Sequence, residues 1–199
     1  SPQIYCKRDD QTGLGFGGNK TRKLEYLLAD ALQHDAKTLV SMGAIQSNHC
    51  RQVAAVAARA GLDCILVLSG NQPAVATGNL FLDQLFGAEV VWAERENRQQ
   101  VLEETVRRAE EMGRAPYMIP YGGSNVVGMM GYYDAMRELR EAEEQLGMRF
   151  DWIVTASSSG GTQAGMVLGA PAWQYRGRIL GIAIEGTAEE LCATVHDLV

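Results

Sequence analysis

Short apolar runs along this chain alternate with segments in which apolar residues recur every three or four positions. The runs are typical of buried strands, and the recurring pattern is typical of helices with one buried face. Parallel strands need a crossover segment between them, so this alternation predicts an α/β fold with a parallel sheet. We expect strands at residues 3–8, 38–42, 64–68, 89–92, 116–119, 152–155 and 179–184, and helices at 52–60, 79–86, 99–112, 127–146 and 188–199.

Helix ends are marked by residues that favour caps. Ser47 and Asn48 stand where an N-cap is expected, ahead of an alanine-rich helix, and Gly61 follows its last residue. Gly87 and Gly113 close the next two helices in the same way. A serine or asparagine oxygen accepts a hydrogen bond from a free N–H of the first turn, and glycine adopts the left-handed backbone that ends a helix.

The order of these elements predicts two lobes. Residues 24–130 form one small α/β domain, and residues 1–23 and 131–199 form the core of a second. The chain begins directly in the strand at 3–8 and ends inside the last helix without a glycine, asparagine or proline. We therefore expect a sequence that is incomplete at its C-terminus.

Composition narrows the class of protein. Hydrophobic residues make up 46% of the 199 positions, enough to bury a core. The formal charge of −6 argues against nucleic acid as a partner, since that affinity depends on clustered lysine and arginine. Four separated cysteines and three histidines without ligand spacing predict reduced thiols and no metal site. No apolar stretch reaches membrane-spanning length and no signal pattern opens the chain, so we expect a soluble, cytoplasmic protein.

Lys20 is the first candidate for chemistry. It follows a glycine-rich run at residues 15–18 and stands at the start of a helix. Glycines let the backbone approach a ligand closely, and a partly desolvated lysine amine becomes a nucleophile able to form a Schiff base. The alternative is a surface turn with solvated lysines. The spacing of the glycines does not match the phosphate-binding loop of nucleoside triphosphatases.

A polar turn at residues 46–49 is the second candidate. Gln46, Ser47, Asn48 and His49 follow a strand and lead into a helix. In open parallel sheets ligands bind at the carboxyl ends of strands, so these side chains stand where a ligand is expected. The alternative is ordinary helix capping by Ser47 or Asn48, with His49 packed in the interior.

A serine- and glycine-rich loop at residues 157–162 is the third candidate. It follows an apolar strand and opens a helix. Unpaired backbone N–H groups and the positive end of the helix dipole converge there, which favours phosphate binding. The loop lacks the GxGxxG pattern of a nicotinamide dehydrogenase. An anion site, a nucleophilic lysine and a polar turn together fit pyridoxal phosphate, which needs all three.

Three motifs carry a resemblance to a known family. Residues 17–25 (GGNKTRKLE), 46–51 (QSNHCR) and 159–165 (SGGTQAG) are similar to the D-cysteine desulfhydrase and 1-aminocyclopropane-1-carboxylate deaminase family of pyridoxal-phosphate enzymes. Residues 77–79 and 122–125 look closest to the desulfhydrases. The resemblance implies the two-lobed tryptophan synthase β-like fold, in which residues 1–23 and 131–199 belong to the large cofactor-binding domain. It also implies a homodimer and a small amino-acid substrate.

The resemblance also implies a role for each matched residue. Lys20 would bind the cofactor covalently and move the α-proton of the substrate. Ser47 would meet the carboxylate or the reactive carbon of the substrate, with Gln46 and His49 beside it. Asn48 would hydrogen-bond the 3-hydroxyl of the cofactor. The phosphate would be held by Ser158, Ser159, Gly160, Gly161 and Thr162, with added charge from Lys23.

The activity expected from this resemblance is conversion of D-cysteine to pyruvate, ammonia and sulfide. Deamination of 1-aminocyclopropane-1-carboxylate and release of sulfite from L-cysteate are the alternatives within the family. A non-catalytic α/β domain that binds another phosphate compound is the alternative from a different class. Family members extend past the end of this sequence, and that part supplies an active-site tyrosine and the group that faces the pyridine nitrogen.

Overall fold

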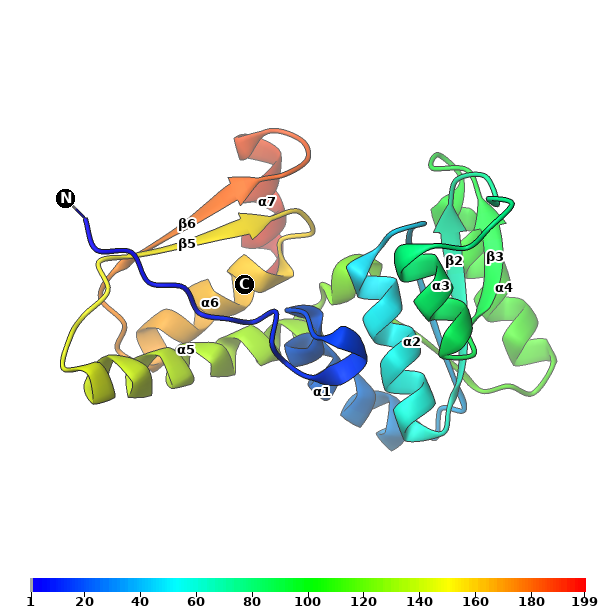
Figure 1. The fold of residues 1–199 in the computed structure, drawn as a ribbon, viewed down its shortest axis with the longest axis horizontal. Helices are drawn as coiled ribbons and strands as arrows, with labels where there is room; N and C mark the ends of the chain where they lie inside the picture. The colour runs from blue at the N-terminus through cyan, green and yellow to red at the C-terminus, as the bar shows by residue number, and fades with distance from the viewer. Residues whose placement is uncertain (1) are drawn as a thin grey trace. The chain divides into compact units, whose positions relative to one another are not determined.

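The computed structural model describes residues 2–199 as an α/β chain with two compact units (Figure 1). The first unit contains residues 2–21 and Ala31–Ile119, and the second contains Arg22–Asp30 and Pro120–Val199. Helix α1 (Lys20–Gln33) contributes residues to both. The α/β class with parallel strands that the sequence predicts is confirmed. The predicted division at residues 23 and 130 stays a prediction.

The first unit is built on a parallel sheet with the strand order β3-β2-β1-β4. Crossovers between parallel strands are right-handed, so α2 and α3 cover one face, while α4 returns the chain to β4 across the other (Figure 1). After β3 the chain therefore reverses its direction across the sheet, and β4 is added on the other side of β1. The elements are β1 (Thr38–Ala44), α2 (Asn48–Ala60), β2 (Asp63–Ser69), α3 (Gly78–Leu85), β3 (Glu89–Ala93), α4 (Arg98–Glu111) and β4 (Pro116–Met118).

The central strands are apolar because both of their faces are covered. Leu39 and Val40 of β1 and Leu66 and Leu68 of β2 are all fully buried, which is why these strands read as continuous hydrophobic runs. The predicted end of α2 is confirmed. Gly61 adopts the left-handed conformation, and its N–H bonds the carbonyls of the last turn.

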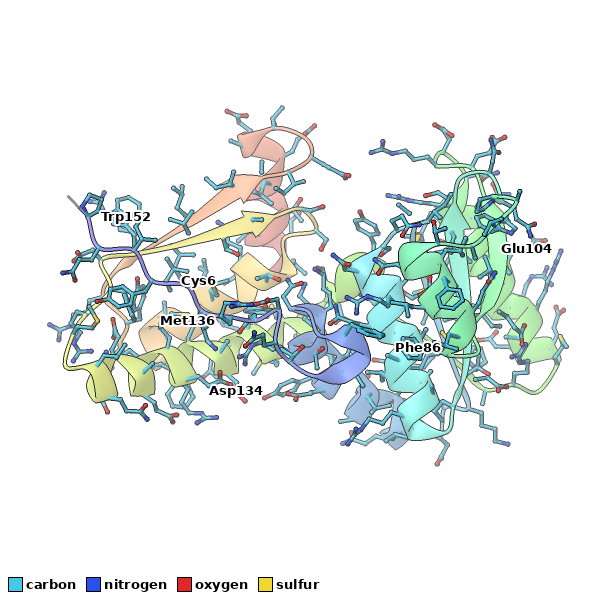
Figure 2. All side chains as sticks on the ribbon, viewed as in Figure 1. Cys6, Phe86, Glu104, Asp134, Met136 and Trp152 are labelled. Carbon is cyan, nitrogen blue, oxygen red and sulfur yellow. The ribbon has the colours of Figure 1, made fainter. Side chains whose placement is uncertain are left out.

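The second unit pairs β5 (Trp152–Ser157) with β6 (Arg178–Ala183) in parallel. Its helices are part of α1, α5 (Val126–Leu146), α6 (Gly161–Ala172) and α7 (Ala188–Leu198). Met136 of α5 is buried in a cluster with Met166 of α6 (Figure 2). Helices α5 and α6 approach backbone to backbone, since a Cβ at Gly165 would overlap the carbonyl oxygen of Met129.

Helix α1 is joined to α5 by polar contacts within the second unit. Arg22 makes two bonds to Glu138, with Nη1–Oε1 and Nη2–Oε2 distances of 2.7 and 2.8 Å. The hydroxyl of Tyr26 donates to the carboxylate of Asp134, and this bond raises the pKa of Tyr26 to about 12. Gly131 lets the helices meet here, because a Cβ would overlap the carbonyl of Arg22.

The strand expected at residues 3–8 is absent, so that prediction is wrong. These residues are exposed and pair with no strand of the described chain. Lys7 bonds Asp9 and Arg8 bonds Asp10, each two residues along the chain. An apolar and polar alternation favours an extended backbone, but a strand forms only where a neighbouring strand satisfies its N–H and C=O groups. The other predicted strands and helices are present, with ends shifted by a few residues.

None of the helices in residues 2–199 is long and apolar enough to cross a membrane.

The close contact between α5 and α6 generates a stability prediction. Gly165→Ala is expected to lower the free energy of unfolding by about 1–3 kcal/mol, because the added methyl group forces the helices apart. Urea unfolding followed by circular dichroism measures this change. Val167→Ala, on the exposed side of the same helix, is the control and should change stability by less than about 0.5 kcal/mol. Equal effects of the two variants would contradict the close-packing argument.

Candidate active site

The glycines before Lys20 are required by close contacts with neighbouring parts of the chain. Gly17 and Gly18 have φ angles of 78° and 138°, which disfavour any other residue. A Cβ at Gly17 would overlap the carbonyl oxygen of Asp10, and a Cβ at Gly18 would overlap the side chain of Gln52. The sequence pattern predicted close approach of a ligand here. In the structure, the space beside these two glycines is filled by the chain.

Lys20 is the first residue of α1 and is half-buried. Its amine donates a hydrogen bond to Oδ1 of Asn19 at 3.4 Å, and no carboxylate in residues 2–199 pairs with it. Burial therefore lowers the pKa of Lys20, because the charged form loses water without gaining an opposite charge. The arrangement favours a neutral, nucleophilic amine rather than a solvated surface lysine.

A chain of hydrogen bonds ties the start of α1 to the start of α2. The hydroxyl of Thr12 bonds both backbone groups of Gly18 and the hydroxyl of Thr21. Thr21 donates to Oε1 of Gln52 at 2.9 Å, and Gln52 donates to the carbonyl of Asn48 at 3.1 Å. The segment that carries Lys20 and the turn that carries Asn48 are thereby held within one unit.

The polar turn is clamped by residues 77–79. Oε1 of Gln46 accepts from the backbone N–H of Asn79 at 2.8 Å, and its Nε2 donates to the carbonyl of Thr77 at 3.1 Å. The amide of Asn79 in turn donates to Oδ1 of Asn48 at 2.9 Å. This last bond leaves the Nδ2 donor of exposed Asn48 directed away from Asn79. The predicted contact between Gln46 and substrate stays a prediction, since its side chain holds the turn together here.

Ser47 and His49 occupy different environments. Ser47 is half-buried and caps α2, its Oγ accepting from the N–H of Cys50 at 3.2 Å, as the sequence predicts. His49 is buried, and its Nε2 lies 2.9 Å from Oγ of Ser41. This placement matches the packed histidine considered as an alternative. A role for His49 at the substrate stays a prediction.

In the second unit, Ser124 joins Lys23 to the loop at residues 157–162. The buried amine of Lys23 donates to the carbonyl of Gly122 and to Oγ of Ser124, both at 3.0 Å. The same oxygen lies 2.7 Å from Oγ of Ser159 and accepts from the N–H of Gly161 at 3.2 Å. The predicted partners Lys23, Ser159 and Gly161 are thus brought together.

The rest of the loop leaves polar groups unsatisfied. Oγ of Ser157 and Oε1 of Gln163 are buried without a hydrogen-bond partner in the part of the chain described. Gly160 precedes α6 with no side-chain cap, and the first N–H groups of a helix have no partner inside it. Ser158 is exposed and Thr162 is buried. A loop that offers uncapped donors at a helix start is suited to an anion.

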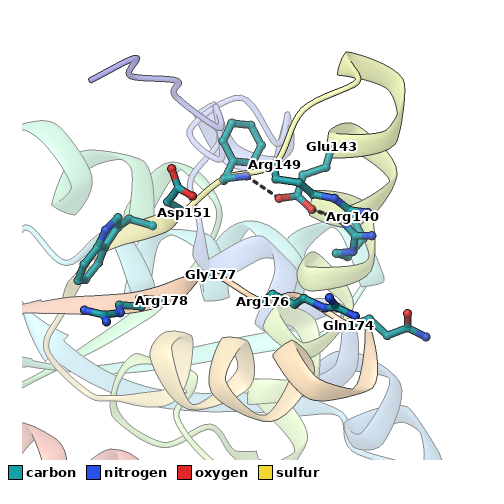
Figure 3. A pocket seen from close by; sticks show the side chains of 10 residues that line it. Arg140, Glu143, Arg149, Asp151, Gln174, Arg176, Gly177 and Arg178 are labelled. Carbon is teal, nitrogen blue, oxygen red and sulfur yellow. Dashed lines mark hydrogen bonds and ion pairs between the residues drawn. The ribbon is translucent and has the colours of Figure 1, made fainter. Parts of the chain in front are cut away.

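A cavity of about 580 Å³ lies in the second unit at the amino ends of β5 and β6 (Figure 3). Arg140 and Arg149 both contact Glu143 at its wall, and Arg178 stacks over Trp152. None of the predicted site residues lines this cavity. The loop at residues 157–162 follows the opposite end of β5. Residues 2–199 hold no group of three or more histidine, cysteine or acidic side chains that could bind a metal ion.

Comparison with known proteins decides the family. Residues 1–197 match the family described as pyridoxal-phosphate dependent enzyme. The chain belongs to this pyridoxal-phosphate-dependent family. It is 43% identical over 194 residues to the D-cysteine desulfhydrase of Yersinia pestis, covering 94% of this chain and 58% of that protein. It is 41% identical over 198 residues to a Pyrococcus furiosus protein with the provisional name 1-aminocyclopropane-1-carboxylate deaminase, covering 98% of this chain and 60% of that one.

A solved structure agrees with this family. The crystal structure of an ACC deaminase homologue, 40% identical, superposes with a TM-score of 0.89 over 96% of this chain and 58% of that one. The predicted resemblance and fold are therefore confirmed. The chain spans about 60% of the length of the relatives it matches.

Two polar residues at the site were not assigned a role from the sequence. Ser124 was detectable, because residues 122–125 repeat the pattern of glycines and serine between a strand and a helix that marks residues 157–162. Gln52 carried no such signal. It lies inside an alanine-rich helix, and only the folded chain shows that it is fully buried and bonded to Thr21 and Asn48.

Ser124 gives a prediction for cofactor affinity in this pyridoxal-phosphate-dependent family member. Ser124→Ala removes a shared partner of Lys23, Ser159 and Gly161 and should weaken binding of pyridoxal phosphate about tenfold. Absorbance titration of the whole protein measures the dissociation constant. Ser69→Ala is the control, a serine-to-alanine change that removes a hydrogen bond outside the loop, from Oγ to the carbonyl of Gly43. Unchanged affinity in Ser124→Ala would exclude this role.

Proposed function

We propose that the whole protein catalyses pyridoxal-phosphate-dependent β-elimination of a small sulfur amino acid, most specifically D-cysteine. The reaction consumes one water and yields pyruvate, ammonia and hydrogen sulfide, so that all atoms balance. The observation that carries the proposal is Lys20, a half-buried amine at a helix start with no acidic partner among residues 2–199. Membership of the family and the name of the Yersinia pestis relative supply the rest of the support.

The second unit has groups suited to the phosphate of this cofactor. Ser158, Ser159, Gly160, Gly161 and Thr162 would bind it through hydroxyls and the N–H groups at the start of α6, with the N–H of Gly161 exchanging its bond to Ser124 for one to the phosphate. Lys23 would add positive charge through its link to Ser124. The buried Oγ of Ser157, which has no partner in residues 2–199, supports this fit because a buried hydroxyl normally finds one.

In the first unit, three residues would act on the ring and the substrate. Lys20 would hold the cofactor and, as a neutral amine, take the proton from the α-carbon of the substrate. Asn48 would donate from Nδ2 to the ring oxygen, an orientation that its bond from Asn79 favours. Ser47 would meet the substrate carboxylate. When bound, the cofactor supplies an electron sink for the pair left on the α-carbon.

The second candidate is deamination of 1-aminocyclopropane-1-carboxylate. It is favoured by the names of the Pyrococcus furiosus relative and of the protein in the superposed crystal structure. Ring opening would place more of the chemistry on Ser47. The turn at residues 77–79, which clamps Gln46 and resembles that of the desulfhydrases, supports the first candidate instead. A homodimer, as the resemblance implies, is part of the proposal.

Lys20 is tested by chemical trapping. Borohydride treatment of the whole protein with pyridoxal phosphate is expected to fix the cofactor on Lys20, located by peptide mass mapping. Lys20→Ala should lose the visible absorbance and the adduct, because no other amine takes its place. Lys37→Ala, an exposed lysine, is the control and should retain both. An adduct that persists in Lys20→Ala would refute the assignment, and a colourless wild-type protein would favour the non-catalytic phosphate-binding alternative.

Substrate choice is tested by products. With D-cysteine the whole protein is expected to release sulfide and pyruvate in equal amounts, at a rate at least about tenfold above that with 1-aminocyclopropane-1-carboxylate, because a site distinguishes substrates by interactions made in the transition state. Sulfide, sulfite, pyruvate and 2-oxobutyrate are measured side by side, with L-cysteate as a third substrate. Release of 2-oxobutyrate alone would establish the second candidate.

A further inference from the structure

Arg51 anchors the glycine-rich run that precedes Lys20. Its guanidinium is almost fully buried between α2 and the turn at residues 13–18. Nη2 donates to the carbonyl of Gly17 at 2.9 Å, and Nη1 donates to the carbonyl of Gly15. Two carbonyls of one turn are therefore fixed by one planar side chain, three residues before the start of α1.

Asp83 of α3 is fully buried, and neither of its carboxyl oxygens has a hydrogen-bond partner among residues 2–199. Nε of Arg51 is likewise buried and unpartnered there. The two side chains interact electrostatically. Phe86, which follows α3 and is labelled in Figure 2, lies against the same turn, since a Cβ at Gly15 would come within 3.5 Å of its ring. The turn at residues 13–18 is thus contacted by Arg51 of α2 and by Phe86 at the end of α3.

We propose that Asp83 and Arg51 form a buried charge pair that positions the turn at residues 13–18, and through it Lys20. A buried carboxylate is strongly disfavoured unless an opposite charge and hydrogen-bond donors compensate for lost water. The two side chains make no direct hydrogen bond in residues 2–199, so the Nε–H donor and the two carboxyl oxygens would be joined through one ordered water. Asp83 is thus a positioning residue, a role that rests on the proposed function of Lys20.

The surroundings of Asp83 make its charge depend on pH. Burial raises the pKa of Asp83 to about 7, and the positive charge of Arg51 partly opposes this rise. Cys50 of α2 and Cys64 of β2 also interact electrostatically with it. Burial raises the pKa of Cys50 to about 12 and that of Cys64 further, so both thiols stay neutral. Arg51, whose own pKa is lowered by burial, is therefore the charge that Asp83 meets.

The direction of the pKa shift of Asp83 distinguishes a role in positioning the turn from a contribution to the free energy of unfolding. The folded pKa of Asp83 lies above that of an unfolded aspartate, so the folded state binds the proton more tightly. Stability is then greatest at low pH and falls as pH rises from about 4 through 7. Because ionised Asp83 lowers the free energy of unfolding, replacing it with a neutral amide should leave overall stability unchanged or higher. If Asp83 positions the turn at residues 13–18, however, the ionised carboxylate should make that turn more ordered than the neutral form does.

The experiment compares Asp83→Asn with Asp35→Asn, an exposed aspartate, in the whole protein at pH 8. Hydrogen exchange of backbone amides in residues 13–20 is expected to become about tenfold faster in Asp83→Asn only. Its rate of cofactor attachment to Lys20, measured by borohydride trapping, should fall about 10- to 100-fold. Its unfolding midpoint should stay the same or rise. Unchanged exchange and attachment would overturn the proposal.

A double variant and the pH dependence of hydrogen exchange provide two further tests of the pair. Arg51→Lys should loosen the turn at least as much, because it also loses the bonds to Gly15 and Gly17. Adding Asp83→Asn to Arg51→Lys should then loosen the turn no further, whereas additive effects would refute the pair. In the unmodified protein, protection of residues 13–18 should fall as pH drops through about 7. The exchange data do not require a bound cofactor. Absence of any Lys20 adduct in the wild type would therefore reject the proposed function while leaving the charge pair to be judged by exchange.

Discussion

A buried cation must be solvated by the protein in place of water, and two turns of this chain depend on that requirement. Lys23 is held by the carbonyl of Gly122, and Arg51 by the carbonyls of Gly15 and Gly17. Glycines are present because these carbonyls must point inward at close range. Each turn opens the segment that leads to a candidate site residue, so the positions of Ser124 and Lys20 follow from where the cations lie.

Lys20 and Lys23 lie three residues apart on one helix, yet they are suited to opposite tasks. The Lys23 amine donates to two oxygen acceptors, the carbonyl of Gly122 and Oγ of Ser124. Lys20 is partly withdrawn from water with one weak acceptor, and its pKa falls. An anion is best met by the first and an electrophilic carbonyl by the second. The hydrogen bonds around each amine, rather than the lysine itself, determine its chemistry.

Much of the fold could be read from the sequence, because buried parallel strands leave continuous apolar runs such as residues 38–42 and helix ends leave glycines such as Gly61. The loop at residues 157–162 and the cap at Ser47 were equally local signals. The pairing of strands leaves no such local signal, and residues 3–8 were therefore assigned to a strand although no neighbouring strand pairs with them in the described chain. Ser124 and the pair of Arg51 with Asp83 depend on contacts between residues far apart in sequence, which no local pattern records.

The backbone contact between α5 and α6 has a consequence for how this protein can vary. Gly165 and Gly169 bring α6 against the main chain of α5, so the start of α6 is located by atoms that every residue shares. Substitutions on the outer faces of either helix can then accumulate without moving the loop that precedes α6. The glycines, by contrast, tolerate almost no change. Sequence drift should therefore be fast on those outer faces and nearly frozen at Gly165 and Gly169.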